Sequence, residues 1–205
     1  HLWFLVSLLI SSYISFLFIN NNAKNSLLIF SIFLYFIGVA LKSYADSPIG
    51  FSVEFNTRNG PFFSTLLFAS GYFMAAYNPN RRWLYYGSVV LVLGVVLHFF
   101  EIYTLMNLFG TSMKHDYVFG TYFMGLGAGM LALSNHSILQ MKFLSNIGTM
   151  VLGIYAVHFM FVDMLRPLDR VIHSAFWEIG YVFLVLLLSL ITTTTISKSI
   201  VLRRI

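Results

Sequence analysis

The stretch from Asn56 to Met74 reads NTRNGPFFSTLLFASGYFM and passes from a polar loop into a long apolar run. Pro61 stands where the apolar run begins, and proline is well tolerated in the first turn of a helix because its missing N–H would be unpaired there anyway. A helix is therefore expected to start at Gly60 and Pro61, with Arg58 beside its unpaired N–H groups. A cation at this end of a helix dipole is unfavourable, and a nearby carboxylate, phosphate or developing oxyanion would reverse the sign.

The polar loop has two interpretations. In the first, Thr57, Asn59 or Gly60 caps the helix and Arg58 extends its charged end to the membrane interface. In the second, Arg58 binds an anion, because charged residues retained at membrane-spanning helices commonly have a functional partner.

The composition is typical of an integral membrane protein. Hydrophobic residues make up 59% of the 205-residue chain and charged residues only 9%. Runs of about 18 apolar residues with few charges are typical of membrane-spanning helices. About seven spans are expected: Leu2–Ile19, Ser26–Tyr44, Pro61–Tyr77, Trp83–Phe100, Val118–Ser134, Ile147–Leu165 and Phe176–Ser197. The sequence therefore predicts an all-α fold, a polytopic transmembrane helix bundle forming a single transmembrane domain over residues 1–205.

Residue usage argues against cysteine chemistry and against a nucleic-acid partner. The chain has no cysteine, which excludes disulfides and thiolate catalysis. Its net charge of +5 comes from basic residues scattered over loops rather than gathered in a patch, which argues against a nucleic-acid partner.

The basic residues orient the expected bundle. Seven lie in one set of loops and the C-terminal tail, which hold no acidic residue: Lys24, Arg81, Arg82, Lys142, Lys198, Arg203 and Arg204. Five basic residues lie in the opposite loops: Lys42, Arg58, Lys114, Arg166 and Arg170. Every Asp and Glu of the chain lies on this opposite side as well. Because Lys and Arg favour the cytoplasmic side, the C-terminus is expected in the cytoplasm and His1 on the outer side.

The segment Lys114-His115-Asp116 lies just before the fifth expected span. In one interpretation it is a solvated cap, because acids favour helix N-termini. In the other, His115 and Asp116 form a proton-transfer pair that faces the same outer cavity as Arg58.

Histidines at helix-face spacing raise two further hypotheses. Tyr155 and His158 are three apart within the sixth span and so share a face; an imidazole there has either a structural partner on another helix or a role toward substrate or protons. His98 and Glu101 are also three apart, but two ligands without a third do not make a metal site, and no metal is expected.

Small residues predict close helix packing in two spans. Gly125-Leu-Gly-Ala-Gly129 places glycines four apart on one helix face, and Gly148 and Gly153 thin the sixth span in a similar way.

Four short segments, taken in order, resemble the acyltransferase-3 family of integral membrane O-acyltransferases: HLWFL at residues 1–5, TRNGPFF at 57–63, KHDY at 114–117 and GIYAVH at 153–158. The resemblance is greatest to the branch containing bacterial O-acetyltransferases of surface glycans and the membrane domain of vancomycin-resistance serine racemases. It implies a fold of about ten helices with both termini cytoplasmic, of which this chain corresponds to the C-terminal part. Without the first three helices seven remain, beginning outside and ending inside, as the charges predict.

One departure from the family's pattern bears on the site. The family's basic residue ten positions before a histidine, and its paired-arginine motif, have no counterpart here; Arg81 and Arg82 are adjacent in a loop and are not assigned that role. The catalytic base is therefore expected upstream of His1, and this segment alone is expected to be inactive. The resemblance assigns substrate binding to Arg58 and Asn59. It assigns catalytic positions to these residues: His115, Asp116, Tyr155 and His158.

The function implied by the resemblance is transfer of an acyl group, expected to be acetyl from acetyl-CoA, to a hydroxyl of a cell-envelope glycan or lipid-linked glycan precursor at a bacterial inner (plasma) membrane. The first alternative is a transporter or channel whose path includes His158, although paired repeats and broken helices are not apparent in the sequence. The second is a non-catalytic membrane subunit.

Overall fold

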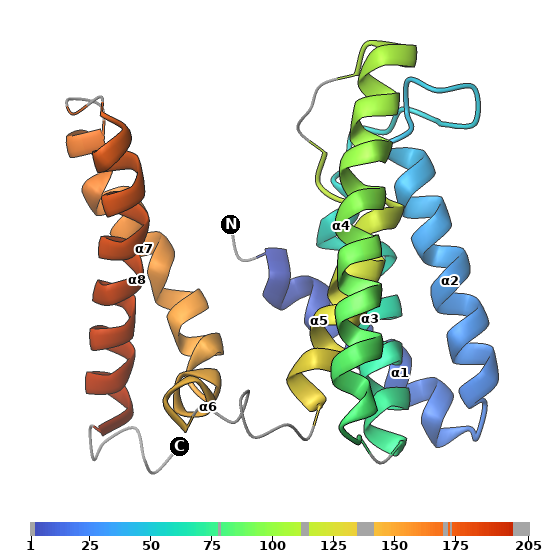
Figure 1. Ribbon diagram of the computed structural model, residues 1–205, viewed down its shortest axis with the longest axis horizontal. Helices are drawn as coiled ribbons and strands as arrows, with labels where there is room; N and C mark the ends of the chain where they lie inside the picture. The colour runs from blue at the N-terminus through green and yellow to red at the C-terminus, as the bar shows by residue number, and fades with distance from the viewer. Residues whose placement is uncertain are drawn as a thin grey trace. The chain divides into compact units, whose positions relative to one another are not determined.

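The computed structural model describes residues 3–77, 79–111, 115–134, 142–169, 172 and 174–198. The chain divides into two compact units, Leu2–Leu139 and Gln140–Ile205, which are treated separately below as the N-terminal and C-terminal units. Every regular element within the described residues is a helix (Figure 1). The predicted all-α helix bundle is confirmed.

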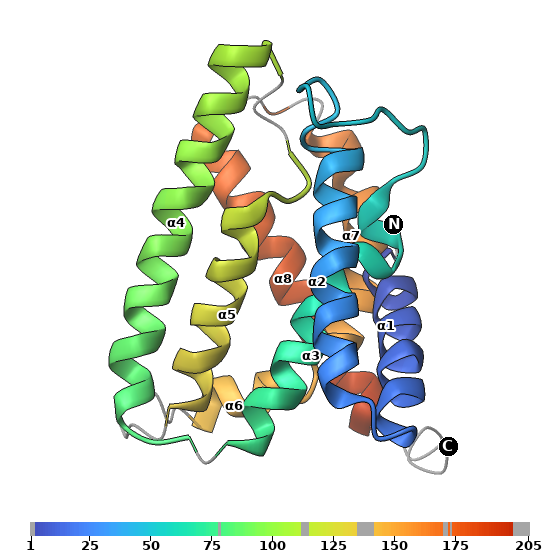
Figure 2. The ribbon, with the colours of Figure 1, turned by 90° about the vertical axis from the view of Figure 1, so that its right-hand side faces the viewer.

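The described part of the N-terminal unit contains five α-helices and a short 3₁₀ turn: α1 (Trp3–Asn20), α2 (Lys24–Leu41), η1 (Thr57–Asn59), α3 (Pro61–Ala76), α4 (Arg82–Phe109) and α5 (Phe119–Leu133). Helix α3 packs against α1, α2 and α5, while α4 packs chiefly along α5 (Figures 1 and 2). Three helices lie in the C-terminal unit as far as its residues are described: α6 (Lys142–Gly148), α7 (Val151–Asp169) and α8 (Ala175–Lys198). Helices α7 and α8 pack against each other.

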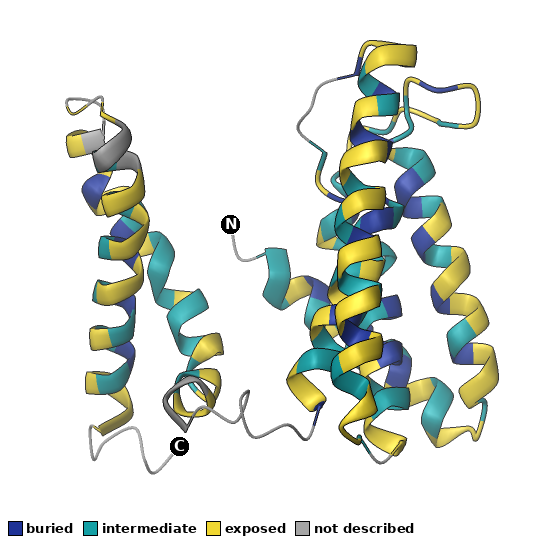
Figure 3. Cartoon of the chain, viewed as in Figure 1, coloured by how far each residue is buried: buried dark blue, intermediate teal, exposed yellow. Residues whose placement is uncertain are grey.

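A helix lies at each of the seven expected spans. Among the described residues, α1, α2, α4, α7 and α8 are long and apolar enough to cross a membrane, while α3 and α5 are apolar but have only 16 and 15 residues. Exposed residues run along α2 and α4 in one unit and along α8 in the other (Figure 3), and many are large and apolar, as in Ile29, Leu93 and Phe183. Lipid is the solvent that such surfaces require, so the chain is a multi-pass membrane protein.

Three expected loops are shorter in the structure. The prediction that a connection begins at Glu101 is wrong: α4 continues to Phe109 and ends at Gly110, whose φ of 64° is the left-handed conformation that glycine favours. The residues beyond Glu101 are largely apolar and contain neither glycine nor proline before Gly110, so nothing stops the helix. Helix α6 likewise lies partly in the expected 135–146 loop, and α7 runs past Pro167 to Asp169.

Glycines bring α4 and α5 close together. A Cβ added to Gly94 would lie 2.5 Å from the Met124 nitrogen, and one added to Gly127 would lie 2.4 Å from the Leu91 nitrogen. The predicted close packing of the 125–129 segment is confirmed and divides between neighbours: Gly127 faces α4, whereas a Cβ on Gly125 would meet a side chain of α3, Leu67. In the C-terminal unit, Gly153 closely approaches Thr193 of α8. The packing of α5 against α4 and α3 fixes the position of α5, whose first turn borders the site described next.

Hydroxyl groups join α1 to the start of α3. The Ser7 hydroxyl donates to the carbonyl of Gly60 at 2.9 Å and lies 2.6 Å from the Ser64 hydroxyl. Ser11 also contacts Ser64, and its hydroxyl lies 3.1 Å from that of Thr65. Interhelical bonds of this kind hold helices together in lipid, where hydrophobic attraction between them is absent. They anchor the N-terminal end of α3, immediately after the loop that carries Arg58.

Candidate functional site

The loop before α3 fixes the backbone of Arg58. The Asn56 side chain accepts a hydrogen bond from the Arg58 N–H at 3.1 Å and thereby caps η1. Thr57 is fully buried, and its hydroxyl faces the carbonyl of Gly38 in α2 at 3.4 Å. Pro61 occupies the first turn of α3, as the sequence predicts. Arg58 is thus held at the start of α3.

The Arg58 side chain contacts an acid and an aromatic ring. Its Nη1 donates to Oδ1 of Asp116 at 2.7 Å, and its guanidinium carbon lies 5.1 Å from the centroid of the Trp3 ring. The two charged side chains are 37% and 23% exposed, so the pair is partly shielded from solvent. Within the described part of the chain, Nε of Arg58 is buried without a hydrogen bond. Asp116 therefore supplies an anion at the start of α3, and the guanidinium keeps donor capacity on its other edge.

The remaining residues of the two loop motifs lie around this pair. Asn59 ends η1 with an exposed side chain, next to Arg58 in the chain. Nε2 of His115 lies 3.4 Å from the Thr111 hydroxyl, whereas Asp116 is engaged with Arg58. The geometry thus joins Asp116 to Arg58 and places His115 against Thr111. Lys114 lies outside the described residues.

Burial favours the neutral form of the His115 imidazole. It lowers the pKa of His115 from its ordinary 6.5, and nearby His98 acts in the same direction. The acids Glu101, Asp116 and Asp46 oppose the shift without reversing it. A neutral imidazole can accept a proton, which is the property that a general base requires.

Tyr117 connects the two loops through the core. Its hydroxyl donates to Oγ1 of Thr57 at 3.0 Å, and its backbone carbonyl accepts a hydrogen bond from Ser43. Gly38 makes room for this contact, because a Cβ there would lie 2.1 Å from the Tyr117 hydroxyl oxygen. Burial raises the pKa of Tyr117 to about 12, so the phenol remains a hydrogen-bond donor at neutral pH. Thr57, Arg58, Asp116 and Tyr117 are called the Arg58 cluster below.

Glu101, which the sequence analysis considered only beside His98, has a role that sequence reasoning missed. Its carboxylate is buried, with the residue only 6% exposed. Oε1 accepts from the Tyr44 hydroxyl at 2.6 Å and from the Phe119 N–H at 3.0 Å, while Oε2 accepts from the Gly120 N–H at 3.0 Å. The carboxylate thereby caps α5 from α4 and compensates the positive end of its dipole.

A sequence signal for this role did exist. Val118, at the N-cap of α5, has no side-chain oxygen, so the first amides of α5 require an acceptor from elsewhere. Glu101 is the acid that the chain places on the preceding helix. The related residues His98 and Glu101 contact different groups: Nδ1 of His98 lies 3.1 Å from the Thr121 hydroxyl, whereas Glu101 accepts from Tyr44 and the first amides of α5. Over the described ranges, no group of three His, Cys, Asp or Glu side chains could hold a metal ion.

The third motif lies in the C-terminal unit. Tyr155 and His158 share one face of α7, with ring centroids 5.1 Å apart, and Nδ1 of His158 contacts the carbonyl of Tyr155. Both rings line a hollow of about 340 Å³ between α7 and α8, whose other walls are apolar side chains: Val151, Ile154, Val182, Val185 and Leu186. The helix-face prediction for this pair is confirmed.

A family model described as an acyltransferase domain matches residues 1–198. The chain belongs to the acyltransferase-3 family. No curated protein and no solved structure matches it.

Acyltransferase-3 membership establishes a membrane acyltransferase domain and confirms the resemblance drawn from the sequence. In such a protein, acyl transfer to a hydroxyl needs a proton acceptor and donors for the charge that develops on the carbonyl oxygen. The N-terminal unit of this acyltransferase-3 chain offers one group of each kind: the neutral imidazole of His115 and the guanidinium of Arg58.

Proposed function

We propose that the full-length protein is a membrane O-acyltransferase of a bacterial inner membrane. It moves an acetyl group from acetyl-CoA to a hydroxyl of an envelope glycan or a lipid-linked glycan precursor. The observation that carries the proposal is the geometry of Arg58 in a member of the acyltransferase-3 family: the side chain is fixed by Asp116 and Trp3, yet its buried Nε–H has no acceptor among the described residues. The acceptor class rests on the resemblance to enzymes of surface polysaccharides.

The reaction joins the acceptor oxygen to the acyl carbon. The hydroxyl loses its proton to a base while its oxygen attacks the thioester carbonyl, which becomes a tetrahedral oxyanion. The carbon–sulfur bond then breaks, the CoA thiolate takes up a proton, and the glycan carries the new ester. In this proposal the main base belongs to the family's signature of a basic residue ten positions before a histidine, which has no counterpart among residues 1–205.

The residues of this chain support that chemistry from two places. Arg58 and Asn59 bind an anionic group of the substrate or stabilise the developing oxyanion, because a guanidinium offers several N–H donors in fixed geometry. Asp116 orients Arg58, and His115 accepts a proton beside them. Tyr155 and His158 provide hydrogen bonds within the apolar hollow of the C-terminal unit. The segment on its own, lacking the base, is inactive in this proposal.

The test is replacement of Arg58 in the full-length protein. Arg58→Ala is expected to lower glycan O-acetylation at least about a hundredfold, the scale seen when a stabilising donor is removed from an acyl-transfer site. Arg58→Lys is expected to recover little activity, because an ammonium does not reproduce the guanidinium fork. Lys42→Ala, which removes an exposed cation elsewhere in the same loop system, is the matched control. A wild-type level of O-acetyl groups on the glycan of an Arg58→Ala strain, with normal protein abundance, contradicts the proposed role.

A further inference from the structure

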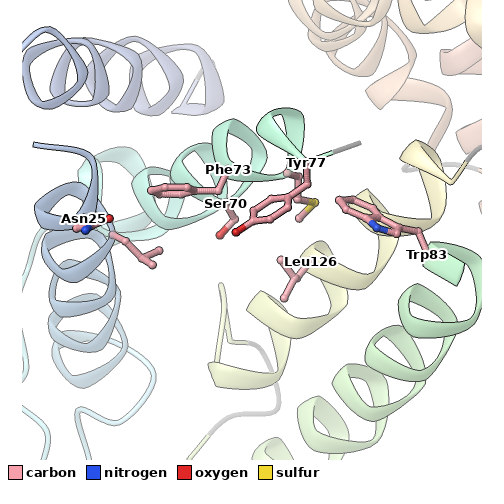
Figure 4. A pocket seen from close by; sticks show the side chains of 8 residues that line it. Asn25, Ser70, Phe73, Tyr77, Trp83 and Leu126 are labelled. Carbon is pink, nitrogen blue, oxygen red and sulfur yellow. The ribbon is translucent and has the colours of Figure 1, made fainter. Parts of the chain in front are cut away.

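A second concave site lies at the opposite end of the N-terminal unit from the Arg58 cluster. It is a pocket of about 420 Å³ between the first turn of α2, the last turns of α3, the first turn of α4 and the middle of α5 (Figure 4). Its lining side chains are mostly apolar or aromatic: Asn25, Leu28, Ser70, Phe73, Met74, Tyr77, Trp83 and Leu126. Neither the loop motifs nor the proposed reaction uses this pocket.

Two basic residues are next in the chain to residues that line the pocket, Lys24 to Asn25 and Arg82 to Trp83. Lys24 is the first residue of α2 and Arg82 the first of α4, and neither helix has an acidic residue in its first turn. The Lys24 ammonium is turned toward α3, 5.8 Å from the centroid of the Tyr72 ring. The sequence segments 20–25 and 77–83 contain no Asp or Glu.

These charges are unfavourable unless an anion joins them. Cations at the N-terminal ends of two helices repel the positive ends of the helix dipoles. The first amides of α4 are already engaged, since Asn80 accepts from the N–H groups of Arg82 and Trp83. At α2, Ala23 precedes the first turn without a side-chain acceptor for its amides. An anion above the pocket would therefore compensate Lys24, Arg82 and the α2 N-terminus together.

The apolar lining identifies the rest of the ligand. Phe73, Leu28 and Leu126 offer a surface that accepts a hydrocarbon chain, while Tyr77 and Trp83 have the amphipathic rings that favour the headgroup level of a bilayer. A hydrocarbon chain below a negative headgroup matches both halves of the site. We propose that this pocket binds one anionic phospholipid of the membrane, with part of an acyl chain in the pocket and the phosphate beside Lys24 and Arg82. The assignment does not depend on the proposed acyl-transfer function.

Trp83 gives a direct readout of the lipid beside it. The full-length protein would be reconstituted in equimolar phosphatidylglycerol and phosphatidylcholine, with brominated chains on only one of the two lipids in each sample. Bromine quenches a neighbouring indole, and subtracting the emission of Trp83→Phe isolates the Trp83 signal. Brominated phosphatidylglycerol is expected to quench Trp83 several-fold more effectively than brominated phosphatidylcholine.

Charge variants locate the headgroup. Lys24→Gln and Arg82→Gln should each lower the preference for phosphatidylglycerol about fivefold, the scale for one basic residue near a membrane surface. Lys42→Gln, an exposed cation just beyond the other end of α2, should leave it unchanged. Equal quenching by the two lipids in the wild type, or an undiminished preference in the Lys24→Gln/Arg82→Gln double variant, overturns the proposal. So does displacement of the bound phosphatidylglycerol by acetyl-CoA at micromolar concentration, which would assign the pocket to the acyl donor.

Discussion

Arg58 meets Asp116 across 58 positions of sequence, whereas His158 bonds to a carbonyl only three positions before it. The Arg58 cluster is assembled from η1 and the loop before α5, and its geometry depends on α2 and α4 as well. The Tyr155–His158 pair is set by the geometry of one helix, α7. This difference indicates how far the structural effect of a substitution will extend. A substitution near the Arg58 cluster is expected to alter several segments, while a substitution at His158 is expected to affect only α7.

Glu101→Ala gives the largest expected loss of stability, because it removes the acceptor of three hydrogen bonds in a buried place. Leaving buried donors unpaired costs about 1–3 kcal/mol for each group, so a loss of at least about 3 kcal/mol is expected in the free energy of unfolding. Thermal unfolding of the detergent-solubilised protein measures it. Glu101→Gln, which keeps an acceptor oxygen, should recover part of the loss, and Glu54→Ala, an exposed acid, should cost little. If Glu101→Ala unfolded at the wild-type temperature, the long-range assembly of this region would be refuted.

Gly38→Ala should have the next largest effect. The added methyl group would lie 2.1 Å from the Tyr117 hydroxyl oxygen and 2.5 Å from Cβ of Phe62, so both neighbours, or the α2 backbone, must move. Overpacking of this kind costs about 1–3 kcal/mol, and it would separate Tyr117 from Thr57. The matched control is Gly71→Ala in α3, where a Cβ meets nothing within 4 Å. Equal unfolding temperatures for the two variants would show that the Tyr117 contact is not needed.

A smaller effect is expected from the titration of His115. Its pKa is lower in the folded protein than its ordinary 6.5, so below that pH the unfolded chain binds more protons than the folded one. The corresponding stability is complete above pH 6.5 and is lost as the pH falls toward the folded pKa. Unfolding temperatures measured from pH 7.5 to 5 should therefore fall less steeply for His115→Gln than for the wild type. Parallel curves would show that His115 is not shielded from water.

The smallest change in stability is expected at His158, even though the proposed function gives it a role. Its bond to the Tyr155 carbonyl lies within one helix, so His158→Gln should change the free energy of unfolding by no more than about 0.5 kcal/mol. Glycan O-acetylation should nevertheless fall in His158→Gln. Tyr155→Phe, which retains the ring, is the variant whose O-acetylation is compared with it. A marked loss of stability in His158→Gln would show that His158, like Glu101, is needed to hold the fold together.

The sequence predicts what local patterns control. Hydropathy locates the helices, Pro61 marks the first turn of α3, and the spacing of Tyr155 and His158 puts them on one face, because each of these depends on a few neighbouring residues. The position of Arg58 at a helix start also indicates that an anion should be near. That this anion includes the Asp116 carboxylate depends on how α5 is placed, which spacing along the chain does not specify.

Glu101 shows the same limit more sharply. Its role requires that α4 continue past residue 100 and that glycine packing bring α4 against α5, so that a carboxylate reaches the Phe119 and Gly120 amides. Each condition is tertiary, and His98 at helix-face spacing suggested a different pairing. A missing cap at Val118 was the local sign that an acceptor had to come from another helix.

The shortness of α5 has a consequence for the membrane itself. Fifteen residues span about 22 Å, less than the roughly 30 Å of a hydrocarbon core. In a bilayer of that thickness, irregular backbone next to α5 would enter the hydrocarbon region, where water cannot satisfy it. The structure provides the missing partners from neighbouring segments: Tyr35 bonds the Val118 carbonyl, Ser43 the Tyr117 carbonyl, and Glu101 the first amides of the helix. A bilayer thinned around α5 would bring surface water down to Arg58, so acyl-chain length of the host lipids becomes a variable that tunes access to the site.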